Sequence, residues 1–137
     1  HLRLPLNSTL VSSARQVPLY LTAASDCPRD RREAYTEAGV QFISIETADG
    51  EVALPELVDD LAARGFTTLL VEGGAHTAAA FLADDLVDRI CLFVAPKTLG
   101  DDAVPAPIAP DRLPEGFHLV RRERFGEDDY FEFVKER

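Results

Sequence analysis

The chain has 137 residues, a mass of 15.0 kDa and a hydrophobic content of 46%, which suits one modest globular domain. Its formal net charge of −10 argues against a general nucleic-acid binder and against binding to anionic membranes, because both need a basic surface. No run approaches the roughly 20 apolar residues of a membrane helix. The first residues also lack the pattern of a signal peptide.

Cysteines and histidines are few and scattered. Cys27 and Cys91 lack C-x-x-C spacing and cannot form a disulfide framework. Cys91 lies in an apolar run, so we expect it to be a small buried filler. No pair among His1, His76 and His118 has the spacing of metal ligands on a helix. We therefore predict no metal site, and a soluble protein of a reducing cytoplasm.

The first half of the chain predicts two strands around a helix. The segment 18–23 is short, apolar and bounded by turn formers, which indicates a buried strand. Ser25-Asp26 followed by Pro28 indicates a helix start, for a helix over residues 29–38 that Gly39 ends. Residues 40–45 include β-branched side chains and predict a second strand.

Apolar residues then recur at helical spacing, with Pro55 near the start of the segment and Gly65 beyond its end. The residues on this apolar stripe are Leu54, Leu57, Val58, Leu61 and Ala62. The next segment, 67–71, is almost wholly apolar after two threonines. We expect it to be a strand buried on both faces of a parallel sheet.

The rest of the chain predicts a helix over residues 75–82, a strand over residues 89–96 and a closing β-hairpin. The hairpin strands are expected at 117–124 and 129–135, on either side of Gly126-Glu127-Asp128. Between the strand and the hairpin, the proline-rich stretch 99–114 predicts an irregular surface loop.

Two patterns within the hairpin predict its surface and its buried side. A basic cluster is expected on the surface, paired with neighbouring acids. Phe131 and Phe133 alternate with Glu132, which predicts one buried face. The basic residues are Arg121, Arg122 and Arg124, and the expected partners are Glu123, Glu127 and Asp128.

This order of elements predicts an α/β fold, with a mainly parallel sheet flanked by helices and a C-terminal antiparallel hairpin. We find no internal repeat and no linker that would divide residues 1–137 into two domains. About four strands and a hairpin make a small core, and no clear strand precedes Leu10. We therefore expect the chain to be the C-terminal portion of a single larger domain, with strands before His1.

The junction Glu72-Gly73-Gly74 is the main candidate site. It lies between the apolar segment 67–71 and the next predicted helix, and ligands of open α/β sheets collect at the carboxyl ends of strands. The helix start offers unpaired backbone N–H groups with a partial positive charge, and glycines let a phosphate approach them closely. Thr77 could add a hydroxyl donor. The carboxylate of Glu72 suits a substrate's amino or hydroxyl groups.

Taken alone, this junction is a weak signal, and a tight turn without a ligand is an equal alternative. The junction is neither a Walker loop nor a G-x-G-x-x-G fingerprint. His76 and Lys97 are further candidates for phosphate contacts, and Thr22 for a cofactor contact. A surface or structural role is favoured for His76 and Lys97.

Several motifs, in order along the chain, resemble those of the riboflavin-biosynthesis reductases. Residues 71–82, VEGGAHTAAAFL, resemble the nucleotide-binding motif of that family. Residues 86–89, LVDR, and 95–100, APKTLG, resemble its "LVDE" and "APKLLG" signatures. Residues 2–8, LRLPLNS, resemble the segment that follows its "VVLDS" strand. The family comprises the reductase domain of the bifunctional pyrimidine deaminase/reductase, with a dihydrofolate-reductase-like fold.

The resemblance implies an enzyme of riboflavin biosynthesis, a 5-amino-6-(5-phosphoribosylamino)uracil reductase. It uses NADPH to reduce a ribosylaminopyrimidine 5′-phosphate to the ribityl form, and it implies a homodimer. Glu72 matches the substrate-contacting glutamate. The cofactor-binding stretch matches Gly73, Gly74, Ala75, His76, Thr77, Ala78, Ala79 and Ala80. No catalytic residue is assigned.

The family's "S-x-D-G" substrate segment does not occur in the 137 residues, and neither do the zinc deaminase signatures. We therefore expect part of an active site. Two alternatives stay open: a dihydrofolate-reductase-like NADPH oxidoreductase of another substrate, and a non-catalytic nucleotide-binding or dimerisation fragment.

Overall fold

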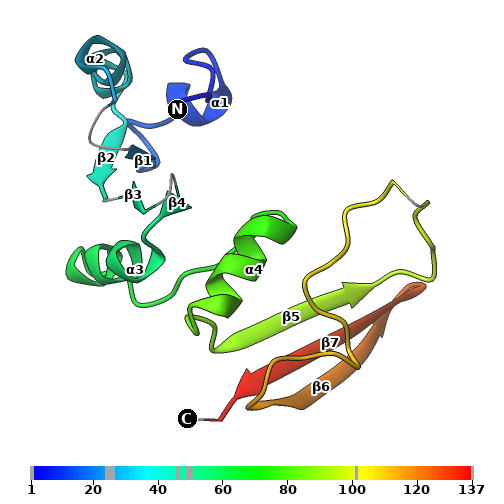
Figure 1. The fold of residues 1–137 in the computed structure, drawn as a ribbon. Coiled ribbons are helices and arrows are strands. Elements are labelled where there is room, and N and C mark those ends of the chain that lie inside the picture. Colours follow the sequence, from blue (N-terminus) through cyan, green and yellow to red (C-terminus); the bar gives the residue numbers. More distant parts are fainter. Residues whose placement is uncertain (1, 24–26, 46, 49–50, 101, 137) are drawn as a thin grey trace. The chain divides into compact units, whose positions relative to one another are not determined.

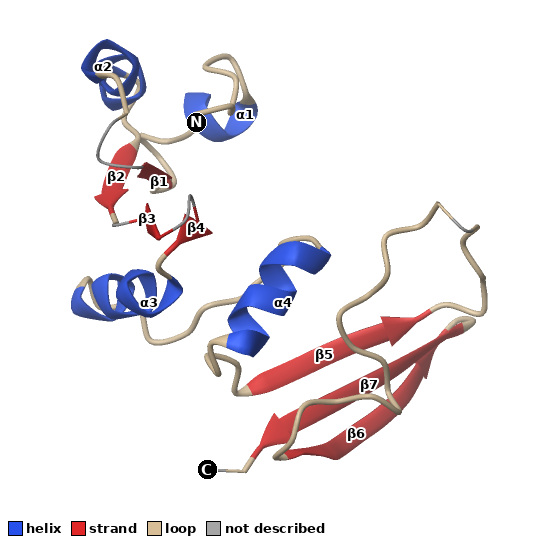
Figure 2. Ribbon diagram, viewed as in Figure 1, coloured by secondary structure: helices blue, strands red, loops and turns tan. Residues whose placement is uncertain are grey.

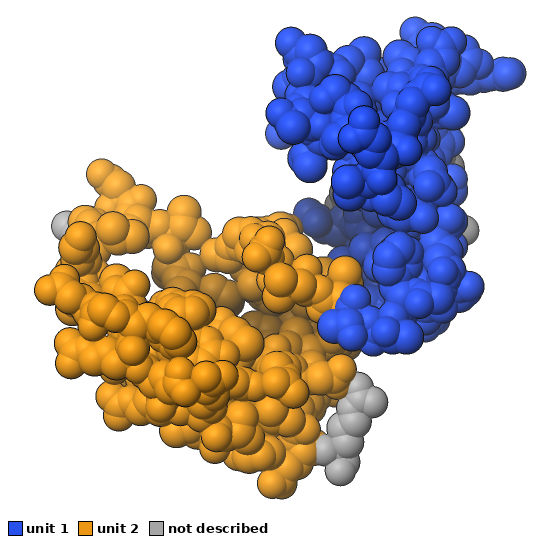
Figure 3. All heavy atoms as spheres, turned by 180° about the vertical axis from the view of Figure 1, so that it is seen from behind, with its two compact units in different colours: residues 1–68 blue, residues 69–137 orange. Residues whose placement is uncertain are grey.

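A computed structural model describes residues 2–23, 27–45, 47–48, 51–100 and 102–136 (Figure 1). His1 and the predicted helix-start residues Ser25 and Asp26 lie outside the described residues. Helices combine with one parallel strand pair and with antiparallel strands, as expected for an α/β protein (Figure 2). The chain divides into two compact units, residues 1–68 and 69–137 (Figure 3). The expectation of a single domain stays a prediction.

Unit 1 is built around a parallel strand pair. Strands β1 (Tyr20–Ala23) and β2 (Gln41–Ser44) pair in parallel, with Tyr20 opposite Gln41. Helix α2 (Arg29–Glu37) connects them, as a parallel connection requires. The predicted strand–helix–strand order is confirmed. After α2 the chain turns at Gly39, whose φ of +100° lies in the region that favours glycine.

The apolar residues of unit 1 form a closed core. Its buried members are Leu2, Val11, Ala14, Ala23, Tyr35 and Val40. The hydroxyl of Tyr35 donates a hydrogen bond to the carbonyl of Leu4. The ring of Tyr35 is therefore buried in the core while its hydroxyl keeps a hydrogen-bond partner. Ile43 on β2 is also buried, with only 1% of its surface exposed.

The remaining elements of unit 1 are short except for one helix. Helix α3 (Leu54–Ala63) confirms the predicted amphipathic helix, with Pro55 in its first turn and Gly65 beyond its end at a φ of +91°. Helix α1 (Thr9–Ser12) and strands β3 (Thr47–Ala48) and β4 (Glu51–Val52) were not predicted. Elements of two to four residues are too short to show a period in the sequence.

Unit 2 consists of helix α4 (Ala75–Ala83) and an antiparallel sheet. The sheet contains β5 (Arg89–Val94), β6 (Phe117–Phe125) and β7 (Asp128–Lys135), in the spatial order β5-β7-β6. Strands β6 and β7 form the predicted C-terminal hairpin, which turns at Gly126 with a φ of +63°. Helix α4, strand β5 and the hairpin are therefore confirmed.

The predicted buried strand at residues 67–71 is wrong for the described structure. No strand is assigned there, and Leu70 exposes 75% of its surface. A strand forms only when a neighbouring strand accepts and donates its backbone hydrogen bonds. None of the described strands pairs with this segment. Apolar composition alone therefore predicted the wrong state.

Two expectations for the sheet of unit 2 also need correction. Cys91 is exposed, although we expected a buried filler. Glu132 is buried, with 8% of its surface exposed, although we expected only the phenylalanine face of β7 to be buried. Strand β7 is the central strand, so neighbouring side chains close over both of its faces. Cys91 lies on β5, which is an edge strand of this sheet.

Candidate functional site

The start of helix α4 forms the centre of the candidate site. Gly74 is its N-cap residue, with an extended backbone (φ −62°, ψ −177°) and no side-chain cap. The carbonyl of Gly74 accepts the first helical hydrogen bond, from the N–H of Ala78 at 3.1 Å. The first backbone N–H groups of an α-helix point along its axis, out of its N-terminal end. They therefore present a partial positive charge at this end.

The two glycines of the turn differ in what surrounds them. A Cβ atom on Gly73 would lie 2.6 Å from the Cβ of Thr77, so the Thr77 side chain packs directly against this glycine. A Cβ atom on Gly74 would meet nothing within 4 Å. Gly73 is therefore required by the fold of the turn itself. Gly74 leaves open space in front of the helix start.

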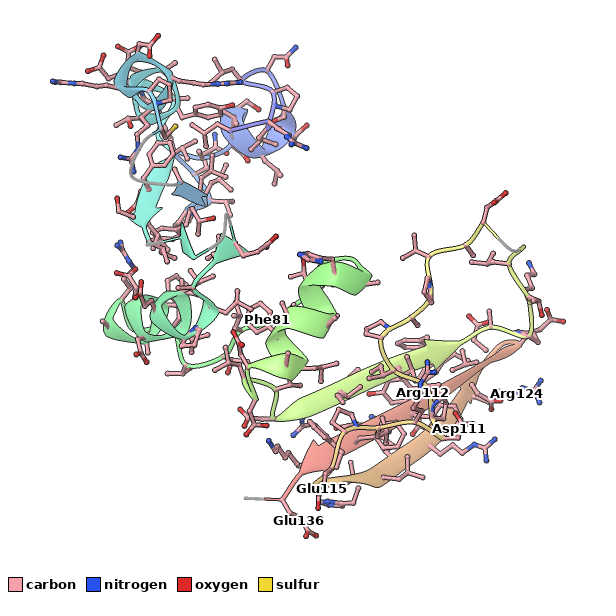
Figure 4. The ribbon with its side chains drawn as sticks, in the orientation of Figure 1. Phe81, Asp111, Arg112, Glu115, Arg124 and Glu136 are labelled. Atoms are coloured by element: carbon pink, nitrogen blue, oxygen red, sulfur yellow. The ribbon has the colours of Figure 1, made fainter. Side chains whose placement is uncertain are left out.

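The other end of α4 is attached to the sheet. Phe81 is the buried residue of the helix (Figure 4). After the helix, the N–H of Leu86 donates to the carbonyl of Phe81 at 3.0 Å, and Asp85 takes a positive φ of 59°. Lys135 on β7 forms an ion pair with Asp85. The sheet thus holds the C-terminal end of α4.

The predicted site residues lie together at this exposed helix start. Glu72, Gly73, Gly74, His76 and Thr77 are all exposed. The first turn of α4 contains no acidic side chain, which favours an anion there. Glu72 is the carboxylate next to the turn, and it precedes the helix.

The secondary candidates lie on other segments of the chain. Lys97 is exposed in the loop after β5, and Thr22 belongs to unit 1. Their contacts with a ligand stay predictions. Among the described residues, no group of three or more histidine, cysteine or acidic side chains could hold a metal ion. In the same residues, no helix is both long enough and apolar enough to cross a membrane.

A hollow next to α4 was missed by the sequence analysis. It has a volume of about 360 Å³ and is lined by Ala79, Leu82 and Ala83 of the helix and by Ile108 and Arg112 of the loop before β6. The small alanine side chains leave this space under the proline-rich loop. The only signal in the sequence was the spacing of the two alanines, which places both on one helix face.

A polar cluster on the sheet was missed as well. The carboxylate of Glu132 accepts a hydrogen bond from Arg89 at 2.5 Å and one from the Tyr130 hydroxyl at 3.3 Å. The same hydroxyl lies 3.3 Å from the Cys91 sulfur. This hydrogen bond to Cys91, together with burial and the negative charge of Glu132, raises the pKa of Tyr130 to about 12.

Comparison with known proteins decides the family. The model of the RibD C-terminal domain family matches residues 1–129. The chain belongs to this family. It is 26% identical over 138 residues to the riboflavin biosynthesis protein RibD of Actinobacillus pleuropneumoniae, covering 97% of this chain and 36% of that protein. It is 29% identical over 126 residues to the 2,5-diamino-6-ribosylamino-4(3H)-pyrimidinone 5′-phosphate reductase of Aquifex aeolicus.

Solved structures of this RibD-like fold agree with the assignment. Acinetobacter baumannii RibD superposes with a TM-score of 0.75 at 22% identity, covering all of this chain and 36% of that one. A pyrimidine reductase-like protein from Corynebacterium diphtheriae also gives a TM-score of 0.75, at 19% identity. At these identities the likeness establishes the fold, which is consistent with the expected dihydrofolate-reductase-like architecture.

The RibD-family chain is shorter than its relatives. It spans 36% of the length of the Actinobacillus protein and 54% of the length of the Aquifex reductase. The match to the Aquifex reductase covers 88% of this chain. Its fold is that of the reductase domains. The activity of the whole protein is therefore a matter for proposal.

Proposed function

We propose that this chain supplies the cofactor-binding turn and one substrate contact of a reductase in riboflavin biosynthesis. The reaction is the NADPH-dependent reduction of a ribosylaminopyrimidine 5′-phosphate to its ribityl form. The observation that carries the proposal is the open N-terminal end of α4 behind Gly74, in a member of the RibD C-terminal domain family.

The turn fits the phosphate groups of NADPH on physical grounds. The space in front of Gly74 lets an anion approach the backbone, and the first turn of α4 offers N–H groups without a repelling carboxylate. The N–H of Ala78 is bonded to the carbonyl of Gly74, so we expect the direct phosphate contacts at the helix residues before Ala78. The following residues, Ala78, Ala79 and Ala80, have small side chains, which leave room for a ligand beside this part of the helix.

Glu72 is assigned to the substrate. A carboxylate beside a phosphate site repels the phosphate, and it accepts hydrogen bonds from the amino and hydroxyl groups of a pyrimidine or a sugar. Glu72 directly precedes Gly73 in the chain, which supports a substrate contact beside the proposed cofactor turn. We infer that Glu72 holds the substrate in register with the cofactor.

When bound, NADPH supplies the hydride that is added at C1 of the ribose, where the ring C–O bond opens and its oxygen takes up a proton. The residues of this chain contribute binding and orientation. The helix start fixes the phosphates, and Glu72 fixes the polar edge of the substrate. Such positioning supplies a large part of the rate of a two-substrate reaction.

The remaining parts of the proposal concern the setting of the protein. We place it in the cytoplasm, which fits the free thiols of Cys27 and Cys91. The acidic chain fits a small-molecule substrate and argues against nucleic acid or an anionic membrane as the partner. A homodimer completes the proposal.

The test uses the full-length protein that contains this chain. We expect NADPH to bind, and to be oxidised when the ribosylaminopyrimidine phosphate is added. The oxidation is measured as the loss of the absorbance of the reduced nicotinamide at 340 nm. Binding without oxidation would contradict the assigned substrate and would favour a reductase of another substrate or a non-catalytic fragment. Absence of NADPH binding would contradict the proposal as a whole.

A Glu72→Gln variant tests the substrate contact separately. Loss of a charge-assisted hydrogen bond worth about 1.5–3 kcal/mol should reduce kcat/KM by about 10- to 150-fold. The Kd for NADPH should stay unchanged. Asp84→Asn, at the exposed C-terminal end of the same helix, is the matched control and should alter neither quantity.

A further inference from the structure

The hollow between α4 and the loop before β6 has apolar walls. Eight described residues line it, and seven of them have side chains without a polar group. The larger apolar side chains are Leu82 on the helix and Ile108 and Leu113 on the loop. Its volume of about 360 Å³ lies at the lower end of the range of about 300–1,000 Å³ that is usual for small-molecule sites. The hollow therefore has the size and the character of a site for a small apolar body.

Helix α4 leaves room for such a body because two of its residues are small. Ala79 and Ala83 are four residues apart, so both lie on the helix face that lines the hollow. Both alanines are exposed, whereas Phe81 on the same helix is buried. The buried ring anchors the helix, and the two alanines leave the space beside it open.

The loop that forms the other wall is restrained. The N–H of Arg112 donates to the carbonyl of Ala109 at 2.9 Å, and the N–H of Ala109 donates to the carbonyl of Arg112 at 3.3 Å. These two bonds close a tight turn over residues 110–111. Three prolines between residues 107 and 114 restrict the backbone further, because the proline ring fixes φ. A wall that is already ordered lowers the entropy cost of binding a ligand.

Arg112 is the one charged residue among the described residues that line the hollow. Within the part of the chain that the structure describes, its side chain forms no ion pair and no hydrogen bond. By contrast, Arg89 and Arg121 are both paired with glutamates. The guanidinium of Arg112 is thus an unpaired cation in a chain with a formal net charge of −10. An unpaired cation beside an apolar hollow favours a ligand with a negatively charged group.

The chemistry of the lining selects a carboxylate as that group. One guanidinium presents two parallel N–H donors, which match the two oxygens of a carboxylate. A phosphate needs further donors, and the other lining side chains offer none. Apolar walls would also leave the amino and hydroxyl groups of a pyrimidine or a sugar without partners, which is costly. Neither NADPH nor the ribosylaminopyrimidine phosphate therefore suits the hollow.

We propose that this hollow binds a small carboxylic acid, with an apolar body of one or two rings against Leu82 and Ile108 and its carboxylate on Arg112. The inference goes beyond the proposed function and does not rest on it, because neither Glu72 nor the Gly73-Gly74 turn lines the hollow.

Titration of the full-length protein with 2-naphthoate tests the site, because this probe joins two fused rings to one carboxylate. Isothermal titration calorimetry should give a Kd below about 1 mM, as expected for an efficiently bound ligand of this size. Arg112→Gln removes the charge and should raise this Kd by about 10-fold or more. Arg31→Gln, at an exposed position on α2, is the matched control and should leave the Kd unchanged.

Two further measurements separate the site from unspecific adsorption. The amide 2-naphthamide has the same rings without the charge, so the wild type should bind it about 10-fold more weakly than 2-naphthoate, and Arg112→Gln should bind it as the wild type does. Ala83→Phe fills the hollow and should abolish binding of both compounds, whereas Ala63→Phe, at the exposed end of α3, should not. Ala83 and Arg112 are both exposed, so these variants should keep the fold.

Three results would overturn the proposal. The first is no binding of 2-naphthoate to the wild type at millimolar concentration. The second is an Arg112→Gln variant that binds 2-naphthoate as tightly as the wild type does. The third is displacement of 2-naphthoate by saturating NADPH, which would make the hollow part of the cofactor site. Oxidation of NADPH is measured in a separate assay, so failure of the proposed function leaves this test intact.

Discussion

The two units of the chain both have buried and exposed apolar residues, but they differ in how completely the most buried ones are covered. Unit 1 closes a core around a parallel strand pair, with Val11 and Ile43 almost fully buried. Unit 2 leaves Phe93 and Phe125 exposed on a sheet, and Glu72 and Gly74 exposed at a helix start. Burial of apolar area stabilises a fold, and exposed groups are available for binding. The most deeply buried side chains therefore lie in unit 1, and the candidate site lies in unit 2.

The largest expected effect on stability is at the core of unit 1. Ile43→Ala removes three buried carbons and leaves a cavity, so we expect the free energy of unfolding to fall by about 2–5 kcal/mol. Leu99→Ala removes the same number of carbons at an exposed position, and it should change the free energy of unfolding by less than about 0.5 kcal/mol. Urea denaturation measures both. Equal effects would remove the contrast between the buried and the exposed sites.

A smaller effect separates the two glycines of the turn. Gly73→Ala forces its new Cβ against Thr77, and overpacking of this kind costs about 1–3 kcal/mol. Gly74→Ala adds a Cβ into open space at a conformation that any residue adopts, so its cost should stay below about 1 kcal/mol. Thermal unfolding of the two variants compares them directly. A larger loss for Gly74→Ala would show that the open space is filled.

The smallest effect concerns Tyr130 at alkaline pH. Its folded-state pKa of about 12 lies above the ordinary value of about 10. Between these values the unfolded chain loses the phenolic proton and the folded chain keeps it, so stability contributed below pH 10 is lost as pH rises towards 12. Tyr130→Phe should show a shallower decline of unfolding free energy over this range. Parallel declines in both proteins would contradict the shifted pKa.

Much of the fold could be predicted because local signals dominate it. The helix over residues 54–63 follows from its apolar spacing and from Pro55, and the hairpin follows from alternation around Gly126. The prediction of a strand at residues 67–71 was wrong because the composition of a segment cannot show whether a partner strand is present. The predictions of burial for Glu132 and Cys91 were wrong for a related reason, because the burial of a strand residue depends on which strand is central in the sheet.

The candidate site was predicted in part. The glycine pair and the helix after it identified the turn, and the structure adds the different roles of its glycines. The sequence could not show that Thr77 packs against Gly73, because that contact depends on the turn geometry. It also could not show the cluster of Phe93, Phe125 and Tyr130, whose three rings come from three different strands.

The most direct test of the account is the affinity of Gly74→Val for NADPH. The branched side chain fills the space in front of α4 and should prevent about two charge-assisted hydrogen bonds, raising the Kd for NADPH by about 100-fold or more. Ala63→Val, at the exposed end of α3, adds comparable bulk outside unit 2 and should leave the Kd unchanged. Isothermal titration calorimetry of the full-length protein measures both. A Gly74→Val variant that stays folded and binds NADPH as tightly as the wild type would contradict a phosphate site at this helix start.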